Sequence, residues 1–154
     1  MTPDTFVPHC RAVMGEFLRD YDFSYCAAYQ RPRGVVVEFR KGDARLFATC
    51  EGGSLHVELM ISSVEQQQYR RISLNQALWY DNIRELVHGR RSCVDQLDMF
   101  VQLADEICAP LLSGIVIDAD ERYCFRMSKE DWHSHIERQT EGLNRAGKGD
   151  STGL

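Results

Sequence analysis

The sequence predicts an α+β domain in which a four-stranded antiparallel meander carries helices on one face. Residues 25–61 alternate between apolar and polar side chains and contain three turn sequences with glycine, which is typical of consecutive β-hairpins. The segments at about 4–20 and 92–111 repeat apolar residues every three or four positions, as amphipathic helices do. These two observations place helices before and after one sheet.

The first predicted element is a helix at about Asp4–Asp20. Thr2 or Asp4 is suited to cap its N-terminus, and Pro8 is tolerated in the first turns. Its apolar residues form one stripe, which is suited to pack on the apolar face of a sheet: Phe6, Cys10, Val13, Met14, Phe17 and Leu18.

The middle hairpin of the meander sets its register. Gly52-Gly53 supplies the positive φ angles of a two-residue turn, so Cys50 faces Leu55 across the strands. The hairpin before it must keep the same apolar residues together, because a shift of one residue moves a strand's whole apolar set to the other face. An even number of loop residues satisfies this requirement.

Two loops of even length are available between the second and third strands. Lys41-Gly42 would pair Glu38 with Arg45, which electrostatics favours. Gly42-Asp43 would pair Arg40 with Arg45, two like charges, but it has the better turn chemistry. The sequence leaves both alternatives open.

This register predicts two unlike faces of the sheet, with the first hairpin turning at 31–34. The inner face is apolar and needs the first and third helices to cover it: Cys26, Ala28, Val35, Val37, Phe39, Leu46, Ala48, Cys50, Leu55, Val57, Leu59 and Ile61. The outer face mixes apolar and polar residues: Tyr25, Tyr29, Val36, Phe47 and Met60 around Glu38, Arg40, Arg45, Thr49, His56 and Glu58.

After the meander, residues 62–68 are polar and without period, which predicts a loop. Tyr69–Ile72 is either a short strand or the approach to the next helix. Ser73-Leu74-Asn75-Gln76 has the pattern of a capping box and begins a helix that runs to about His88. Ser92 caps the third helix, and Pro110 with Gly114 is expected to end it.

The C-terminal part allows two interpretations. Tyr123–Met127 is either a strand that pairs with a sheet edge or part of a final helix, and Ser128 begins a polar helix that carries Trp132 and Ile136. We expect one domain over residues 1–141 and a loose tail over 142–154, where Gly, Lys, Asn and Ser dominate.

The composition disfavours two classes of partner. A net charge of -5 and a pI near 5.5 argue against nucleic acid and anionic membranes, and favour a neutral or basic protein. The six cysteines are scattered and no apolar run is long enough to span a membrane, so we expect reduced thiols and a cytoplasmic location.

The candidate chemical groups are few. His56 and Glu58 lie side by side on the outer face and would serve as an acid/base pair if one pocket contained both. Residues 118–121 resemble the opening of a calcium loop, but Lys129 stands where its last glutamate belongs. His133 and His135 are two positions apart and point away from each other on a helix. We assign no catalytic residue, metal or cofactor.

The outer face is the predicted binding surface, formed by Tyr25, Tyr29, Phe47, Met60, His56, Glu58, Arg40 and Arg45. An apolar centre surrounded by charged residues is typical of a binding patch. The alternative is that Tyr123–Ile136, with Trp132, folds back and covers this face.

The layout of residues 4–112 resembles that of small acidic bacterial proteins, many of them uncharacterised and some acting as immunity proteins beside toxins. The resemblance rests on an N-terminal helix, the meander with V-V-V-E-F and a Gly-Gly turn, and a short helix with S-L-x-x-A-L. It carries over no functional residue, and the part after Leu112 lies outside it.

The leading functional hypothesis is a non-catalytic protein-binding module, of the immunity type that inhibits a basic partner. Pairing of edge strands, or contact between two exposed patches, could also produce a homodimer. One alternative is a surface that stacks a small ligand or single-stranded nucleic acid on Tyr25, Tyr29 and Phe47. The other is an enzyme that uses His56 and Glu58. The sequence leaves the enzyme question open and leans against catalysis.

Overall fold

The computed structural model of this chain describes residues 3–63, 65–80, 92–112 and 122–141. The elements follow in the order α1 (Pro3–Arg19), β1 (Ser24–Arg31), β2 (Gly34–Lys41), β3 (Ala44–Glu51), β4 (Ser54–Ser63), β5 (Gln68–Ser73), α2 (Leu74–Tyr80), α4 (Cys93–Leu112), β6 (Cys124–Arg126) and α5 (Lys129–Gln139). The strands form one antiparallel sheet in the order β1-β2-β3-β4-β5-β6. The α+β class is confirmed, and the predicted four-stranded meander is extended by β5 and β6.

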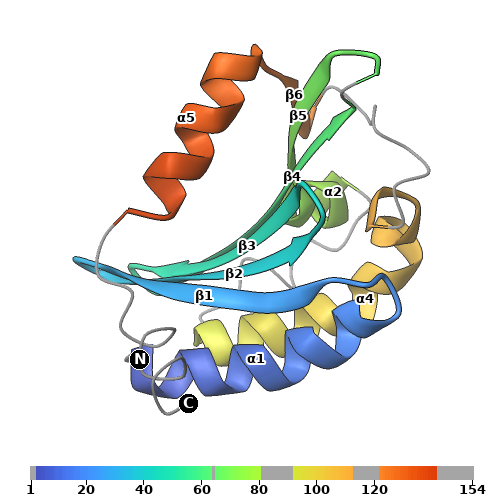
Figure 1. Ribbon diagram of the computed structural model, residues 1–154. Helices are drawn as coiled ribbons and strands as arrows, with labels where there is room; N and C mark the ends of the chain where they lie inside the picture. The colour runs from blue at the N-terminus through green and yellow to red at the C-terminus, as the bar shows by residue number, and fades with distance from the viewer. Residues whose placement is uncertain (1–2, 64, 81–91, 113–121, 142–154) are drawn as a thin grey trace.

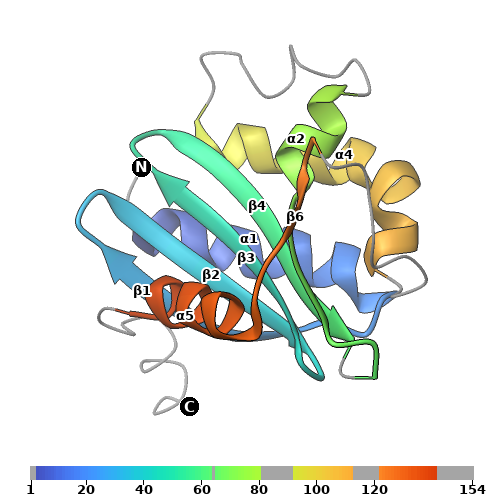
Figure 2. The ribbon, with the colours of Figure 1, turned by 90° about the horizontal axis from the view of Figure 1, so that it is seen from above.

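The described elements form three layers (Figure 1). α1 and α4 lie side by side against the inner face of the sheet, where their apolar stripes and the inner-face residues form the main core. α5 lies on the opposite side of the sheet (Figures 1 and 2). The prediction that α1 and α4 cover the inner face is therefore confirmed, whereas the expectation of helices on one face only is corrected by α5.

The register of the meander follows its turns. Cys50 pairs with Leu55, as Gly52-Gly53 predicts, and both glycines have positive φ angles. Between β2 and β3 the loop is Gly42-Asp43, because Arg40 pairs with Arg45. The repulsion expected for that pair is offset by the buried Glu38 carboxylate, to which both guanidinium groups donate at 2.8 Å.

A bulge in β1 corrects the prediction for Tyr25 and Cys26. The register shifts between Tyr25 and Ala27, so Tyr25 pairs with Phe39 and packs on the inner-face core, while Cys26 is exposed. One extra residue in a strand moves every side chain before it to the other face. The bulge thereby gives the inner face an aromatic ring, 6.0 Å from that of Phe39, in place of a small thiol.

The outer face is covered by α5, which confirms the second alternative and corrects the exposed patch. Phe47 and Met60 are fully buried, and they form a second apolar cluster with Val36, Trp132 and Ile136. Trp132 and Ile136 are four positions apart, so they share one face of the helix and cover the apolar residues of the sheet. The Trp132 indole N–H donates to the carbonyl of Arg70 at 3.2 Å.

Three helix starts follow the predicted serine caps. The hydroxyls of Ser73, Ser92 and Ser128 accept hydrogen bonds from the backbone N–H three residues ahead, at 3.4, 3.2 and 3.0 Å. α4 ends at Leu112, between Pro110 and Gly114 in the sequence, where its end is predicted. No helix in the described ranges is long and apolar enough to cross a membrane.

The structure also corrects the predicted loop at 62–68. Ser62 pairs with Tyr69 and Ser63 with Gln68, so β4 and β5 extend into this polar segment and form a hairpin arm. Strand pairing there satisfies backbone groups and does not require apolar side chains. The predicted helix beyond Tyr80, the segment 113–121 with its acidic turn, and the tail 142–154 lie outside the described residues.

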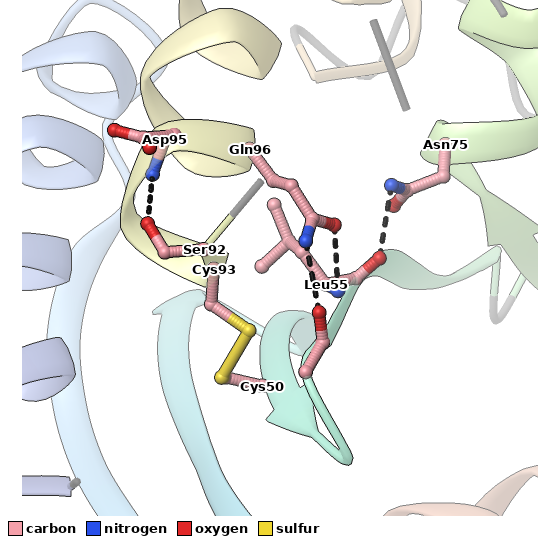
Figure 3. Close-up of a disulfide and its surroundings, with 8 residues drawn as sticks. Cys50, Leu55, Asn75, Ser92, Cys93, Asp95 and Gln96 are labelled. Carbon is pink, nitrogen blue, oxygen red and sulfur yellow. Dashed lines mark hydrogen bonds between the residues drawn. A yellow bond between two sulfur atoms is a disulfide. The ribbon is translucent and has the colours of Figure 1, made fainter. Parts of the chain in front are cut away.

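A disulfide between Cys50 and Cys93 ties the end of β3 to the start of α4 (Figure 3). The expectation of reduced thiols is thus wrong for this pair, because the fold brings their Cα atoms to 6.0 Å, within the reach of a disulfide. Nearby, the Gln96 side chain accepts from the N–H of Leu55 and donates to the carbonyl of Gly53. Asn75 donates to the Leu55 carbonyl.

Candidate functional site

A cleft of about 610 Å³ lies between α5 and the polar part of the outer face. It exists because α5 covers the apolar residues of that face and leaves neighbouring polar positions open. The cross-strand pairs Thr49–His56 and Glu58–Ser73 bring these positions together. The lining residues come from five strands, two helices and the β1–β2 turn: Arg31, Pro32, Thr49, Glu51, His56, Val57, Glu58, Arg71, Ser73, Gln76, Phe125, His135 and Gln139.

Glu58 is the most constrained polar group in the cleft, with a side chain only 12% exposed. His135 Nε2 lies 2.7 Å from its Oε2, and Gln139 Nε2 donates to the same oxygen. Arg71 Nη1 lies 3.6 Å from Oε1. Burial alone would raise the pKa of Glu58, but the hydrogen bond and charge of His135, with smaller contributions from Gln139 and Arg71, outweigh it and hold the pKa below its ordinary value.

Arg71 and His56 are two nitrogen-bearing cleft residues whose donors are unused within the described ranges. The Nε atom of Arg71 is buried and has no hydrogen-bond partner within the described ranges. The Arg71 guanidinium lies over the Phe125 ring, with Cζ 4.8 Å from the ring centre. His56 is exposed in the cleft, and its imidazole makes no hydrogen bond to any residue that the structure describes.

Arg31 anchors the C-terminal end of α5, the helix that forms one wall of the cleft. Its Nη2 donates to the Arg138 carbonyl at 2.6 Å and to Gln139 Oε1 at 3.0 Å, at the C-terminal end of α5. A cation at this end of a helix is favourable, because the last carbonyls carry partial negative charge. Arg31 therefore fixes α5 against the end of β1, and Gln139 in turn reaches Glu58.

The cleft also holds the predicted pair of His56 and Glu58, so the condition for the enzyme hypothesis is met. The imidazole that contacts Glu58, however, is that of His135. A carboxylate beside an imidazole orients the ring, and such a pair is one half of an acid/base mechanism. The hydroxyl of Ser73, the nearest serine along the lining strand, accepts from the N–H of Gln76 as a helix cap.

The remaining charged residues of the predicted surface form a separate cluster around Glu38, which is fully buried. Arg40 Nε and Arg45 Nη1 donate to its Oε2 at 2.8 Å, and the Tyr29 hydroxyl donates to its Oε1 at 3.0 Å. Burial and the neighbouring carboxylate raise the pKa of Tyr29. With three donors on one carboxylate, this cluster is a satisfied structural network.

The predicted binding surface is therefore divided among four places. His56 and Glu58 line the cleft, while Tyr29, Arg40 and Arg45 surround Glu38. Phe47 and Met60 lie beneath α5, and Tyr25 belongs to the inner face.

Arg71, Phe125, His135 and Gln139 were missed as site residues. Arg71 and Phe125 are cross-strand partners in β5 and β6, two strands that the sequence indicates only weakly. Arg71 and Ser73 do alternate with the buried Ile72, which is the one sequence signal that would have placed them on the outer face. The positions of His135 and Gln139 over Glu58 depend on how α5 docks.

Within the described residues, no three His, Cys, Asp or Glu side chains lie together as a metal site would require. Comparison with models of protein families, with curated proteins and with solved structures finds no match for this chain. The function is therefore argued from the geometry and chemistry of the cleft.

Proposed function

We propose that this chain is a binding module that takes a small ligand in the cleft between α5 and the outer face of the sheet. The observation that carries the proposal is a concave site of about 610 Å³ in which Arg71 and His56 make no hydrogen bond to a described residue. Ligand sites in proteins have this size, and they combine apolar surface with a few polar groups that fix orientation.

The burial of the predicted aromatic patch favours a cleft over a broad protein interface. Protein interfaces are centred on exposed aromatic or large aliphatic side chains. In the part of the chain that the structure describes, Phe125 is the single large hydrophobic residue that is exposed, at 37%. It stands at the cleft, so the exposed apolar surface and the unused donors coincide.

An immunity-type inhibitor of a basic protein is the second candidate. The net charge of -5 favours it, because acidic proteins associate faster with basic partners. Phe125 and the exposed Glu51, at the edge of the cleft, would then contact the partner. Binding to a basic protein with no response to small molecules would favour this second candidate over the first.

The test is ligand screening by NMR on the uniformly ¹⁵N-labelled full chain. A set of small carboxylic acids, phosphate esters, amides and amines is added at millimolar concentration, and amide shifts are followed. We expect at least one compound to shift residues 56–58, 71–73 and 135–139 while the signals of α1 stay in place. If none of the compounds shifts the signals of the cleft residues, the proposal is overturned.

A cleft-blocking variant separates specific from surface binding. Thr49→Trp places a large ring on the cleft wall, at an outer-face strand position where aromatic residues are accommodated. Ser24→Trp introduces the same ring at an exposed position of β1. We expect Thr49→Trp to abolish the shifts and Ser24→Trp to preserve them.

A further inference from the structure

The unused hydrogen-bond donors of Arg71 indicate the chemical class of the cleft ligand. An arginine carries five N–H donors in a planar fork. The one ion pair of Arg71 in the described ranges is with Glu58, and its Nη1–Oε1 distance of 3.6 Å is too long for a hydrogen bond. Its Nε is buried and unpartnered within those ranges. A buried donor without an acceptor is unfavourable, and the side chain as a whole is 36% exposed, so an oxygen atom of a ligand in the cleft can reach the guanidinium group.

Glu58 leaves Arg71 available. The Oε2 atom of Glu58 already accepts from His135 and Gln139, and Arg71 lies near the other oxygen, Oε1, without a hydrogen bond to it. Arg31, the other arginine of the cleft, donates instead to the end of α5. Arg71 is thus the cation of the cleft whose donors remain unused by described residues.

The charges of the lining residues permit an anion to enter. Two arginines and two glutamates line the cleft, so their formal charges cancel. His56 lies in the same cleft with both ring nitrogens unused by described residues, which supplies a second donor for the same ligand.

Phe125 provides an apolar surface for the part of the ligand that lies next to the anionic group. Its ring is the exposed large apolar surface of the cleft and packs under the Arg71 guanidinium. This contact holds the guanidinium plane in a fixed orientation, which suits it to bind two oxygens of one group. The remaining exposed part of the ring is free to contact apolar atoms of the ligand.

We infer that the cleft recognises an oxyanion, a carboxylate or a phosphate, attached to an apolar or aromatic group, with Arg71 and His56 on the oxyanion and Phe125 against the apolar part. This inference rests on the proposed function and names the ligand class for the same site. Carboxylate and phosphate share the planar pair of acceptor oxygens that an arginine fork matches.

The experiment titrates the full chain with four probes of similar size: benzoate, phenyl phosphate, benzamide and benzylamine. Binding is followed by the side-chain Nε–H signal of Arg71 and by the amide of Phe125. We expect benzoate or phenyl phosphate to bind at least tenfold more tightly than benzamide and benzylamine, and the stronger of the two identifies the oxyanion.

Two variants and a matched control assign the contact. Arg71→Gln removes the fork, and we expect it to weaken binding of the preferred anion about tenfold or more. Arg19→Gln makes the same charge change at the exposed end of α1 and should leave affinity unchanged. His56→Ala alters an exposed side chain, so it tests the site even if Arg71→Gln unfolds the domain, and it should weaken anion binding severalfold.

The outcomes separate this inference from the proposed function. Equal binding of all four probes in the cleft, with no effect of either variant, would overturn the oxyanion inference and leave a cleft that binds ligands. Shifts at Phe125 with benzylamine alone would also overturn it. The absence of cleft shifts with any compound, including the larger screening set, would overturn both.

Discussion

Glu58 sets the electrostatic balance at the centre of the cleft. It joins β4 to α5 through His135 and Gln139, and it faces Arg71 on its other oxygen. Its pKa is lower than the ordinary value of 4.5, because these contacts outweigh the effect of burial. The same carboxylate therefore contributes both to the shape of the cleft and to the stability of the fold.

This shift predicts a pH dependence for the variant Glu58→Gln. A carboxyl with a lower pKa in the folded state stabilises the protein above about pH 4.5, and the contribution is lost as the pH falls through the folded-state pKa. We expect the variant to be less stable than the parent at pH 7, and the difference to shrink in acid. Urea unfolding at pH 7 and at pH 3 measures it.

Glu137→Gln is the control, since Glu137 is an exposed carboxylate on α5, the helix that Glu58 contacts. Its effect should be small at both values of pH. A stability difference for Glu58→Gln that does not change with pH would show that the carboxylate contributes no charge-dependent stabilisation.

Gly34 is required by close packing at the start of β2. A Cβ built there would lie 1.8 Å from the carbonyl oxygen of Cys50 and 2.8 Å from the Cα of Glu51, both backbone atoms that move little. We expect Gly34→Ala to destabilise the domain by about 3 kcal/mol or more, as overpacking against backbone does. Chemical denaturation measures the loss.

Gly15 provides the opposite case in α1, because a Cβ there meets nothing within 4 Å. Gly15→Ala should stabilise the domain by about 0.5–1 kcal/mol, since alanine is the better helix former. Equal effects of the two substitutions would show that the contact at Gly34 relaxes at little cost.

At the scale of elements, α5 decides what the outer face does. It has eleven residues, and a helix of that length is marginal in isolation, so its stability comes from docking. Trp132 and Ile136 supply the apolar contact, and Arg31 holds the C-terminal end. The docked helix buries Phe47 and Met60 of the predicted patch, and it forms one wall of the cleft.

We expect Trp132→Ala to undock α5. The indole is 3% exposed and donates to the Arg70 carbonyl, so its removal leaves a cavity and removes one hydrogen bond between α5 and β5. The cost should be about 3 kcal/mol, measured by urea unfolding, with faster amide exchange confined to α5. Ser134→Ala, at an exposed position of the same helix, should change stability by less than about 0.5 kcal/mol. Slow exchange in α5 of the Trp132→Ala chain would contradict this account.

At the scale of the whole molecule, the Cys50–Cys93 disulfide links the sheet to α4 across 43 positions of sequence. The link restricts the unfolded chain, so it should stabilise the fold by about 2–4 kcal/mol. It also bears on the predicted cytoplasmic location, which stays a prediction, because disulfides are rare in a reducing cytosol.

The disulfide is tested by counting thiols and by melting. The chain unfolded without reductant should expose four thiols, those of Cys10, Cys26, Cys108 and Cys124. Reductant should lower the Tm of the parent chain and leave that of the Cys93→Ala variant unchanged. Six reactive thiols in protein prepared without reductant would show that the pair is reduced.

The sequence predicts most of the architecture because its strongest signals are local. Two glycines at 52–53 and the alternation around them are sufficient for the register of β3 and β4, and serine caps are sufficient for three helix starts. The loop at Gly42-Asp43 remained open, since the pairing of Arg40 with Arg45 depends on where the Glu38 carboxylate lies.

What the sequence determined by itself is the α+β class, the apolar underside of the meander and the two helices that cover it, because hydrophobic period and turn chemistry act over a few residues. Tertiary structure alone decided the bulge at Tyr25, the covering of Phe47 and the joining of His56, Arg71 and Phe125 in one cleft. Those features depend on which distant surfaces bury each other best, and no local pattern specifies that choice.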